Sequence, residues 1–238
     1  MVLRNIILKK IFFLLPFLGL YIKNNNFVTQ STFIMSQNIQ EDLVHIRSMM
    51  ERSSRFISLS GLSGIFAGIF ALLGAGYAAF LFESNGMSYF DGLEKVYNAD
   101  LIYKLIAAGI VILVLALLSG FLFTFKKSRK NNLPIWTSTT KVMLLQLTIP
   151  LAVGGVFCLA LIYHGLFAFL APATLLFYGL ALVNAGKYTY SDIQYLGYFQ
   201  LFLGCVSLFF LGYGLIFWSL GFGILHIVYG TIMFKKYR

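Results

Sequence analysis

The distribution of acidic residues is the feature that most constrains this chain. Its eight Asp and Glu residues all lie between long apolar runs or before the first of them. A charge at the centre of a bilayer is costly, so runs without charge through their middles suit helices that contact lipid and each other. The pattern therefore predicts a multi-pass membrane protein whose spans contain no ion relay. The acidic residues are Glu41, Asp42, Glu51, Glu83, Asp91, Glu94, Asp100 and Asp192.

The composition excludes an ordinary water-soluble domain. The chain is 59% hydrophobic and 11% charged, whereas soluble domains are about 45–50% apolar and about 25% charged. No break in composition separates two domains, which indicates one membrane domain. Cys158 and Cys205 both lie within apolar runs and are expected to be small buried hydrophobes, with a cross-helix pair as the alternative.

Six apolar runs are candidate spans. A helix needs roughly 17–25 residues to cross the hydrocarbon core, and backbone in lipid must satisfy its own hydrogen bonds. The predicted fold is therefore all-α, a polytopic transmembrane helical bundle over residues 56–238, with the short fifth run extending back toward Ile193. The runs are residues 56–82, 105–125, 142–163, 166–183, 196–211 and 215–234.

Lys and Arg residues predict the orientation of the spans, because cytoplasmic loops carry an excess of them. The loop after the first run instead contains four acidic residues against Lys95 and Lys104, and the turns at 164–165 and 212–214 are uncharged. Basic residues thus alternate between sides, which predicts an N-in/C-in protein of the cell inner membrane. Because they cluster at span ends, their expected partners are the lipid bilayer and anionic lipids at the cytoplasmic face, not nucleic acid. The basic positions are Arg47, Arg52 and Arg55, then Lys126, Lys127, Arg129, Lys130 and Lys141, then Lys187, and finally Lys235, Lys236 and Arg238.

Residues 1–34 do not fit this scheme. The apolar run 11–22 has the length of a signal-peptide core, but Lys23 and three asparagines follow it instead of a cleavage site. An additional span here would also place the basic residues before the first run on the outer side. Our hypothesis is that Met35 initiates the protein and that 1–34 is an upstream extension or a mis-annotated start.

Residues 35–55 are predicted to be a cytosolic juxtamembrane segment with an amphipathic helix over 40–57. Leu43, Ile46, Met50 and Ile57 share one face at helical spacing. The favoured interpretation is a helix on the inner leaflet with its arginines at anionic headgroups. A docking helix for a cytosolic protein partner is the alternative.

His226 is the most distinctive residue at membrane depth. It lies near the middle of the sixth run, with Gly223 and Gly230 on the same helix face. An ionisable residue in a span is a functional candidate. The alternative is a purely structural role, in which a neutral imidazole forms a hydrogen bond to a neighbouring helix. His164 and His45 lie at other depths, so neither a haem nor a metal site is expected, and no cofactor is predicted.

Two prolines define a second candidate. Pro150 in the third run and Pro172 in the fourth are expected to loosen those helices, and Gln146 and Asn184 add polar groups beside them. Broken helices in paired positions can mark the substrate site of a transporter, although kinks also occur without transport.

Small residues in the first run predict close helix packing. Gly64 and Gly68 form a GxxxG motif, which supports packing inside the bundle or formation of a homo-oligomer. Packing inside the bundle is the favoured interpretation. No nucleophile elbow, zinc motif or phosphate-binding glycine loop accompanies these residues. The sequence therefore provides no positive sign of an enzyme.

Three stretches resemble a family of uncharacterised bacterial six-span inner-membrane proteins. They are RSMMERSSRFISLSGLSGIFAGIFALLGAG at 47–76, APATLLFYGLALVN at 171–184 and GFGILHIVYG at 221–230. The resemblance extends from about residue 35 to residue 238 and leaves out 1–34. It implies no activity or catalytic residue, and the frequent proximity of such genes to a small winged-helix regulator implies a role in signalling or stress.

These observations favour a non-enzymatic sensor, regulatory or structural membrane component. The alternative is a small transporter, or a subunit of one, that uses the third and fourth spans. The two differ at His226, which would be dry and hydrogen-bonded in a packed regulator and would line a hydrated midplane cavity in a transporter.

Overall fold

The computed structural model describes residues 60–87, 98–132 and 134–237. The chain divides into two units, Met1–Ser53 and Ser54–Arg238, and every described residue belongs to the second. This part of the chain consists of helices and connections, without a strand. The upstream segment 1–34 and the juxtamembrane segment 35–55 of the sequence analysis lie outside the described residues.

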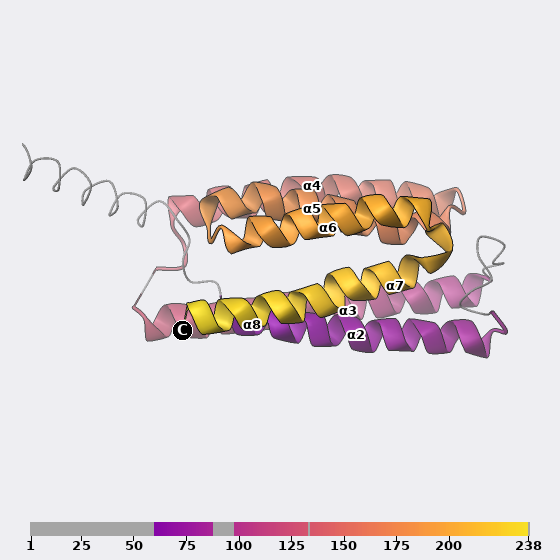
Figure 1. Cartoon of the computed structure of the whole chain (residues 1–238), viewed down its shortest axis with the longest axis horizontal. Coiled ribbons are helices and arrows are strands. Elements are labelled where there is room, and N and C mark those ends of the chain that lie inside the picture. Colours follow the sequence, from indigo (N-terminus) through magenta and orange to yellow (C-terminus); the bar gives the residue numbers. More distant parts are fainter. Residues whose placement is uncertain (1–59, 88–97, 133, 238) are drawn as a thin grey trace, which may run out of the picture. The chain divides into compact units, whose positions relative to one another are not determined.

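The second unit contains a series of long helices joined by short connections (Figure 1). The last helix is one continuous rod in which a π-helical stretch, η4, separates α7 from α8. Short 3-10 turns precede α5, follow it and precede α7. The helices are α2 Gly61–Ser84, α3 Ala99–Lys130, α4 Ser138–Tyr163, α5 Leu170–Ala185, α6 Asp192–Phe209, α7 Gly214–Trp218, η4 Ser219–Leu225 and α8 His226–Lys236.

Five helical segments of the described residues are long and apolar enough to cross a membrane, which agrees with the predicted class of protein. They are Gly61–Ser84, Ala99–Lys130, Ser138–Tyr163, Phe167–Tyr188 and Leu211–Lys236. The fifth predicted run is also helical, as α6, but it is not one of the five. Its 18 residues include Asp192, Gln194 and Gln200, and these polar side chains lower its hydropathy.

Helix ends differ from the predicted runs where polar residues continue the helix. α3 was predicted over 105–125 but begins at Ala99, because the Asn98 side chain caps it by accepting a hydrogen bond from the Leu101 backbone N–H at 2.7 Å. It continues to Lys130, since basic side chains are favourable in the last turn of a helix. α6 begins at Asp192 and ends at Phe209, before the predicted end at residue 211.

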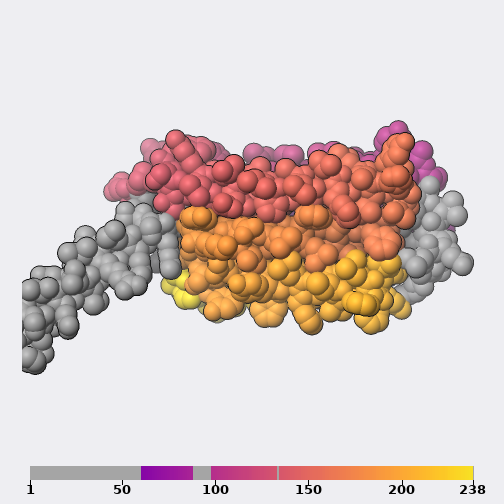
Figure 2. Space-filling model, turned by 90° about the horizontal axis from the view of Figure 1, so that it is seen from above, coloured from indigo at the N-terminus to yellow at the C-terminus, as the bar shows by residue number. Residues whose placement is uncertain are grey.

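The helices of the described residues form two groups of three, with α7, η4 and α8 counted as one rod. α5 packs between α4 and α6, and α2 packs between α3 and the α7–α8 rod, as the two layers of Figure 1 show. The groups meet mainly where α5 and α6 contact the α7–α8 rod. Figure 2 looks onto the first group, where side chains of α4, α5 and α6 are closely packed. The outer faces of α3 and α4 expose large apolar side chains such as Leu117 and Leu159, as expected of helices in lipid.

The glycines singled out in the sequence lie on facing helices, at the seam between α2 and the last rod. A methyl group on Gly68 would lie 2.6 Å from the Gly223 carbonyl oxygen, and one on Gly64 would lie 3.2 Å from the Gly230 Cα. Backbone therefore approaches backbone along the seam, which only residues without a bulky side chain permit.

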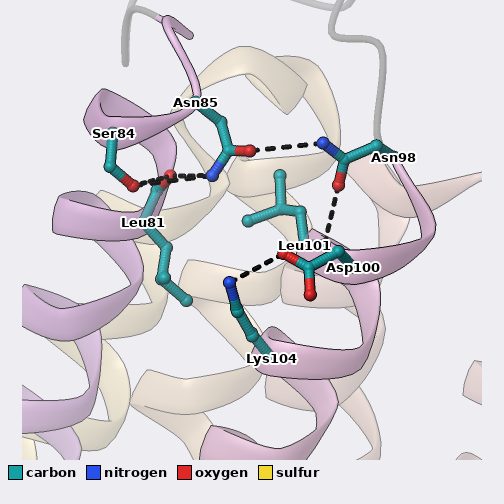
Figure 3. Close-up of polar contacts among 7 residues, drawn as sticks. All are labelled: Leu81, Ser84, Asn85, Asn98, Asp100, Leu101 and Lys104. Carbon is teal, nitrogen blue, oxygen red and sulfur yellow. Dashed lines mark hydrogen bonds and ion pairs between the residues drawn. The ribbon is translucent and has the colours of Figure 1, made fainter.

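Polar contacts join the C-terminal end of α2 to the N-terminal end of α3 (Figure 3). Asn98 donates a side-chain hydrogen bond to Asn85 Oδ1 at 3.2 Å, and Asn85 in turn donates to the Leu81 carbonyl oxygen at 2.8 Å. Lys104 pairs with Asp100 on the same helix at 2.7 Å. The two asparagine bonds satisfy the Leu81 carbonyl oxygen and join the C-terminal end of α2 to the N-terminal end of α3.

Candidate functional site: a buried polar cluster around His226

The site forms around the π-helical stretch of the last rod. A π turn carries one more residue than an α turn and so displaces backbone carbonyls from the regular ladder of hydrogen bonds. Here the Gly221 carbonyl oxygen accepts from two side chains, His226 at 2.9 Å and Gln200 at 2.8 Å. Glycine at 221 also makes room for Gln200, because a methyl group there would lie 2.6 Å from the Gln200 side-chain oxygen.

His226 is buried, with 6% of its surface exposed, and both ring nitrogens have partners. Nδ1 lies 2.9 Å from the Gly221 carbonyl oxygen, and Nε2 lies 2.8 Å from the Tyr178 hydroxyl oxygen. Phe222 stacks on the imidazole with ring centres 5.9 Å apart and also contacts the Tyr178 ring at 5.0 Å. The imidazole is therefore enclosed by aromatic rings.

The partners of His226 determine its tautomer. A carbonyl oxygen only accepts hydrogen bonds, so the Nδ1 that faces Gly221 carries the ring proton. Nε2 of the neutral ring is then an acceptor and receives the Tyr178 O–H. The 3.5 Å separation between Gln200 Nε2 and His226 Nδ1 joins two donors and adds no hydrogen bond. A neutral imidazole therefore satisfies both of its ring nitrogens.

Gln200 is the incompletely satisfied member of the cluster. Its side chain is fully buried, and its Nε2 donates to the Gly221 carbonyl oxygen, while its Oε1 has no hydrogen-bond partner among the described residues. A buried acceptor without a partner costs about 1–3 kcal/mol. The sequence analysis did not single out Gln200 or Tyr178. An amide within an apolar run was the signal that could have identified Gln200.

The cluster joins the two groups of helices. Tyr178 lies on α5 and Gln200 on α6, whereas Gly221 and His226 lie on the rod that packs with α2. Its hydrogen bonds therefore cross the contact between the groups. A change in the relative position of the groups would have to break or rearrange them.

A second polar contact joins the same groups at the end of the bundle. The Tyr237 hydroxyl donates to Asp192 at 2.6 Å, and Lys236 forms an ion pair with the same carboxylate at 3.0 Å. Tyr190 stacks on Tyr237 with ring centres 3.9 Å apart, and Lys127 of α3 lies over the Tyr190 ring at 5.5 Å. Burial raises the pKa of both tyrosines, and the hydrogen bond to Asp192 raises that of Tyr237 further.

The remaining predicted residues do not join the cluster. Pro150 is half-buried inside α4, where it removes the backbone hydrogen bond to the Gln146 carbonyl, yet the helix continues through it. Pro172 is fully buried in the first turn of α5. A helix tolerates proline in its first turn, so Pro172 does not loosen α5 as the sequence analysis expected. Gln146 and Asn184 are half-buried on α4 and α5.

The described residues contain no group of three His, Cys, Asp or Glu side chains placed to hold a metal ion. Cys158 and Cys205 are free thiols, so the cross-helix pair considered above does not form. What the arrangement provides is a set of hydrogen bonds between helices, without an assembled nucleophile and base.

Long apolar helices around a buried polar cluster define the chain as a helical integral membrane protein. A scan against protein-family models gave no match. Searches of curated proteins and of solved structures also gave no match.

Proposed function

We propose that the protein is a non-enzymatic sensor, regulatory or structural component of the membrane, in which the His226 cluster holds two groups of helices in one arrangement. The observation that carries this proposal is the burial of His226, with a partner at each ring nitrogen. A buried, hydrogen-bonded imidazole suits a packed bundle better than a substrate path.

Two features favour a regulatory role over a purely structural one. π-helical turns occur frequently at functional sites, and this one lies at the contact between the groups. The unpartnered Gln200 oxygen leaves the cluster short of its best hydrogen bonding. In a regulatory protein, a second arrangement of the groups would give this oxygen a partner.

We further propose six spans with N-in/C-in orientation in a cell inner membrane, with α6 as the fifth of them. An 18-residue helix is about 27 Å long, close to the roughly 30 Å of the hydrocarbon core. The basic ends of α3 and α8 support the assignment of the inner side. Membership in the bacterial six-span family that the three stretches resemble belongs to the same proposal.

Cysteine labelling tests the proposed packing. In a background with Cys158 and Cys205 replaced by Ala, Leu225→Cys places a thiol beside His226, and Asn131→Cys places one at the exposed end of α3. A membrane-impermeant maleimide should label Asn131→Cys in opened membranes and leave Leu225→Cys unreacted. Rapid labelling of Leu225→Cys in the folded protein would instead support the transporter alternative, because that position would face water.

The same reagent tests the orientation. Tyr163→Cys, at the exposed C-terminal end of α4, should react from the outer side of intact cells, while Asn131→Cys should react only after the membrane is opened. The reverse pattern would contradict the N-in/C-in arrangement. Equal labelling of both positions in intact cells would contradict α4 as a span between them.

A further inference from the structure

The C-terminal end of α3 combines a cationic surface with aromatic hollows. A helix of 32 residues is about 48 Å long, well beyond the roughly 30 Å of the hydrocarbon core. In the proposed topology its basic last turn lies at the depth of the lipid headgroups. Arg129 and Lys130 on this turn, and Lys126 just before it, are all exposed.

Two adjoining open hollows lie against this end of α3 and share Phe125 and Arg129. The first, of about 360 Å³, reaches from the helix to the connection that leads into α4, and the second, of about 450 Å³, follows the helix itself. Both have mainly apolar walls. The first is lined by Phe121, Phe125, Ser128, Arg129, Ile135 and Trp136, and the second by Leu122, Phe125, Lys126, Arg129 and Lys130.

The charge at the hollows has one sign. Within the described residues, the carboxylates in ion pairs are Asp100, which pairs with Lys104, and Asp192, which pairs with Lys236. Neither lies on the walls of the hollows. An arginine above an apolar floor with no acid in the wall attracts an anion that carries apolar chains.

We propose that this surface binds an anionic phospholipid. The Arg129 guanidinium contacts the phosphate through two parallel hydrogen bonds, and Lys126 adds positive charge beside it. An acyl chain lies along Phe121 and Phe125 toward the bilayer centre. Trp136 covers the glycerol region, at the depth that tryptophan favours. The apolar floor selects a lipid over free phosphate, which would need only the cations.

This inference rests on the membrane placement in the proposed function and not on the role of the His226 cluster. The labelling of Leu225→Cys and the binding of lipid can therefore succeed or fail separately.

Native mass spectrometry of the full chain in mild detergent tests the site. The protein is mixed with equal amounts of phosphatidylglycerol and phosphatidylcholine, and the bound lipid is counted for the wild type and for variants. Arg129→Ala removes the proposed phosphate ligand. Lys187→Ala is the matched control, because it removes one exposed positive charge at the same end of the bundle but outside both hollows.

The wild type should retain phosphatidylglycerol about tenfold more strongly than phosphatidylcholine. Arg129→Ala should weaken that binding about tenfold, the scale of a charge-assisted contact, while Lys187→Ala leaves it unchanged. Arg129→Lys keeps the charge but loses the two parallel hydrogen bonds, so its affinity for phosphatidylglycerol should lie between those of the wild type and Arg129→Ala. Such an intermediate affinity shows that the loss of binding does not reflect misfolding.

Three outcomes would overturn the proposal. Equal retention of the two lipids would show no selection for an anionic lipid. Equal losses in Arg129→Ala and Lys187→Ala would indicate a diffuse charge effect. Displacement of phosphatidylglycerol by millimolar inorganic phosphate would identify a phosphate site in which the apolar floor has no role.

Discussion

Replacement of Gly230 by alanine should weaken the contact between α2 and α8. A methyl group at this position would lie 2.6 Å from the Ile65 backbone nitrogen, 2.7 Å from the Gly61 carbonyl oxygen and 3.0 Å from the Gly64 carbonyl carbon. All three are backbone atoms and cannot rotate away, so the helices themselves must separate. Ordinary contact begins near 3.4 Å, which requires a separation of about 0.8 Å.

Separation of the two helices lowers the free energy of unfolding because it weakens their packing. A gap of about 0.5–1 Å forfeits a quarter to a half of each dispersion contact, and overpacking of a well-packed core costs about 1–3 kcal/mol. Alanine favours a helix over glycine by up to about 1 kcal/mol, which offsets part of the loss. Because all three clashing atoms are backbone, the upper end of that range applies, and the net expectation is a decrease of about 2 kcal/mol in the free energy of unfolding, or roughly thirtyfold in the equilibrium constant.

Unfolding in mixed detergent micelles, followed by tryptophan fluorescence, measures this decrease. Gly64→Ala should cost less than Gly230→Ala, because its methyl group would meet its nearest atoms at 3.2 and 3.3 Å. Gly109→Ala on α3 is the matched control, since nothing lies within 4 Å of its methyl position. If Gly230→Ala and Gly109→Ala unfold at the same detergent composition, close packing of α2 against α8 is refuted.

Three further perturbations address polar contacts. Tyr178→Phe removes the hydrogen bond to His226 and keeps the ring, so the unfolding free energy in micelles should fall by about 1 kcal/mol; no change would place the hydroxyl outside the cluster. Because the pKa of Tyr237 is raised in the folded protein, its stabilising contribution is constant below about pH 10 and is lost as the pH rises through the folded value. Unfolding measured from pH 8 to 11 should show this loss, and Tyr237→Phe, which cannot bond to Asp192, should reduce it. Asn98→Ala removes the N-cap of α3 and should cost about 1 kcal/mol by the same assay, whereas an unchanged midpoint would mean that water replaces the cap.

The helical segments were predictable because the bilayer restricts the backbone. An apolar run in lipid must close its own hydrogen bonds, so each long run became a helix wherever the structure describes it. The turn at His164 and Gly165 was also readable, and Gly165 adopts a positive φ of 72° there. The ends of α3 and α6 were less predictable, because caps and basic last turns extend a helix beyond its apolar part.

Only part of the candidate site could be predicted from the sequence. His226 is ionisable and lies in an apolar run, so its chemistry alone identified it. Tyr178 and Gln200 are among many uncharged polar residues of the chain, and nothing local distinguishes those that meet His226 from those that do not. The π-helical stretch left no pattern in the sequence that we identified.

The sequence by itself determined the class of protein and the existence of its helices, because transfer into lipid depends on local composition. Only the tertiary structure decided which helices are neighbours, since the glycine seam between α2 and α8 joins segments from opposite ends of the described chain. It also decided that the Gln200 amide, the Tyr178 hydroxyl and the Gly221 carbonyl lie around the His226 imidazole. Such a cluster depends on how each helix is rotated about its axis, and that rotation is set by packing against neighbours rather than by the helix's own sequence.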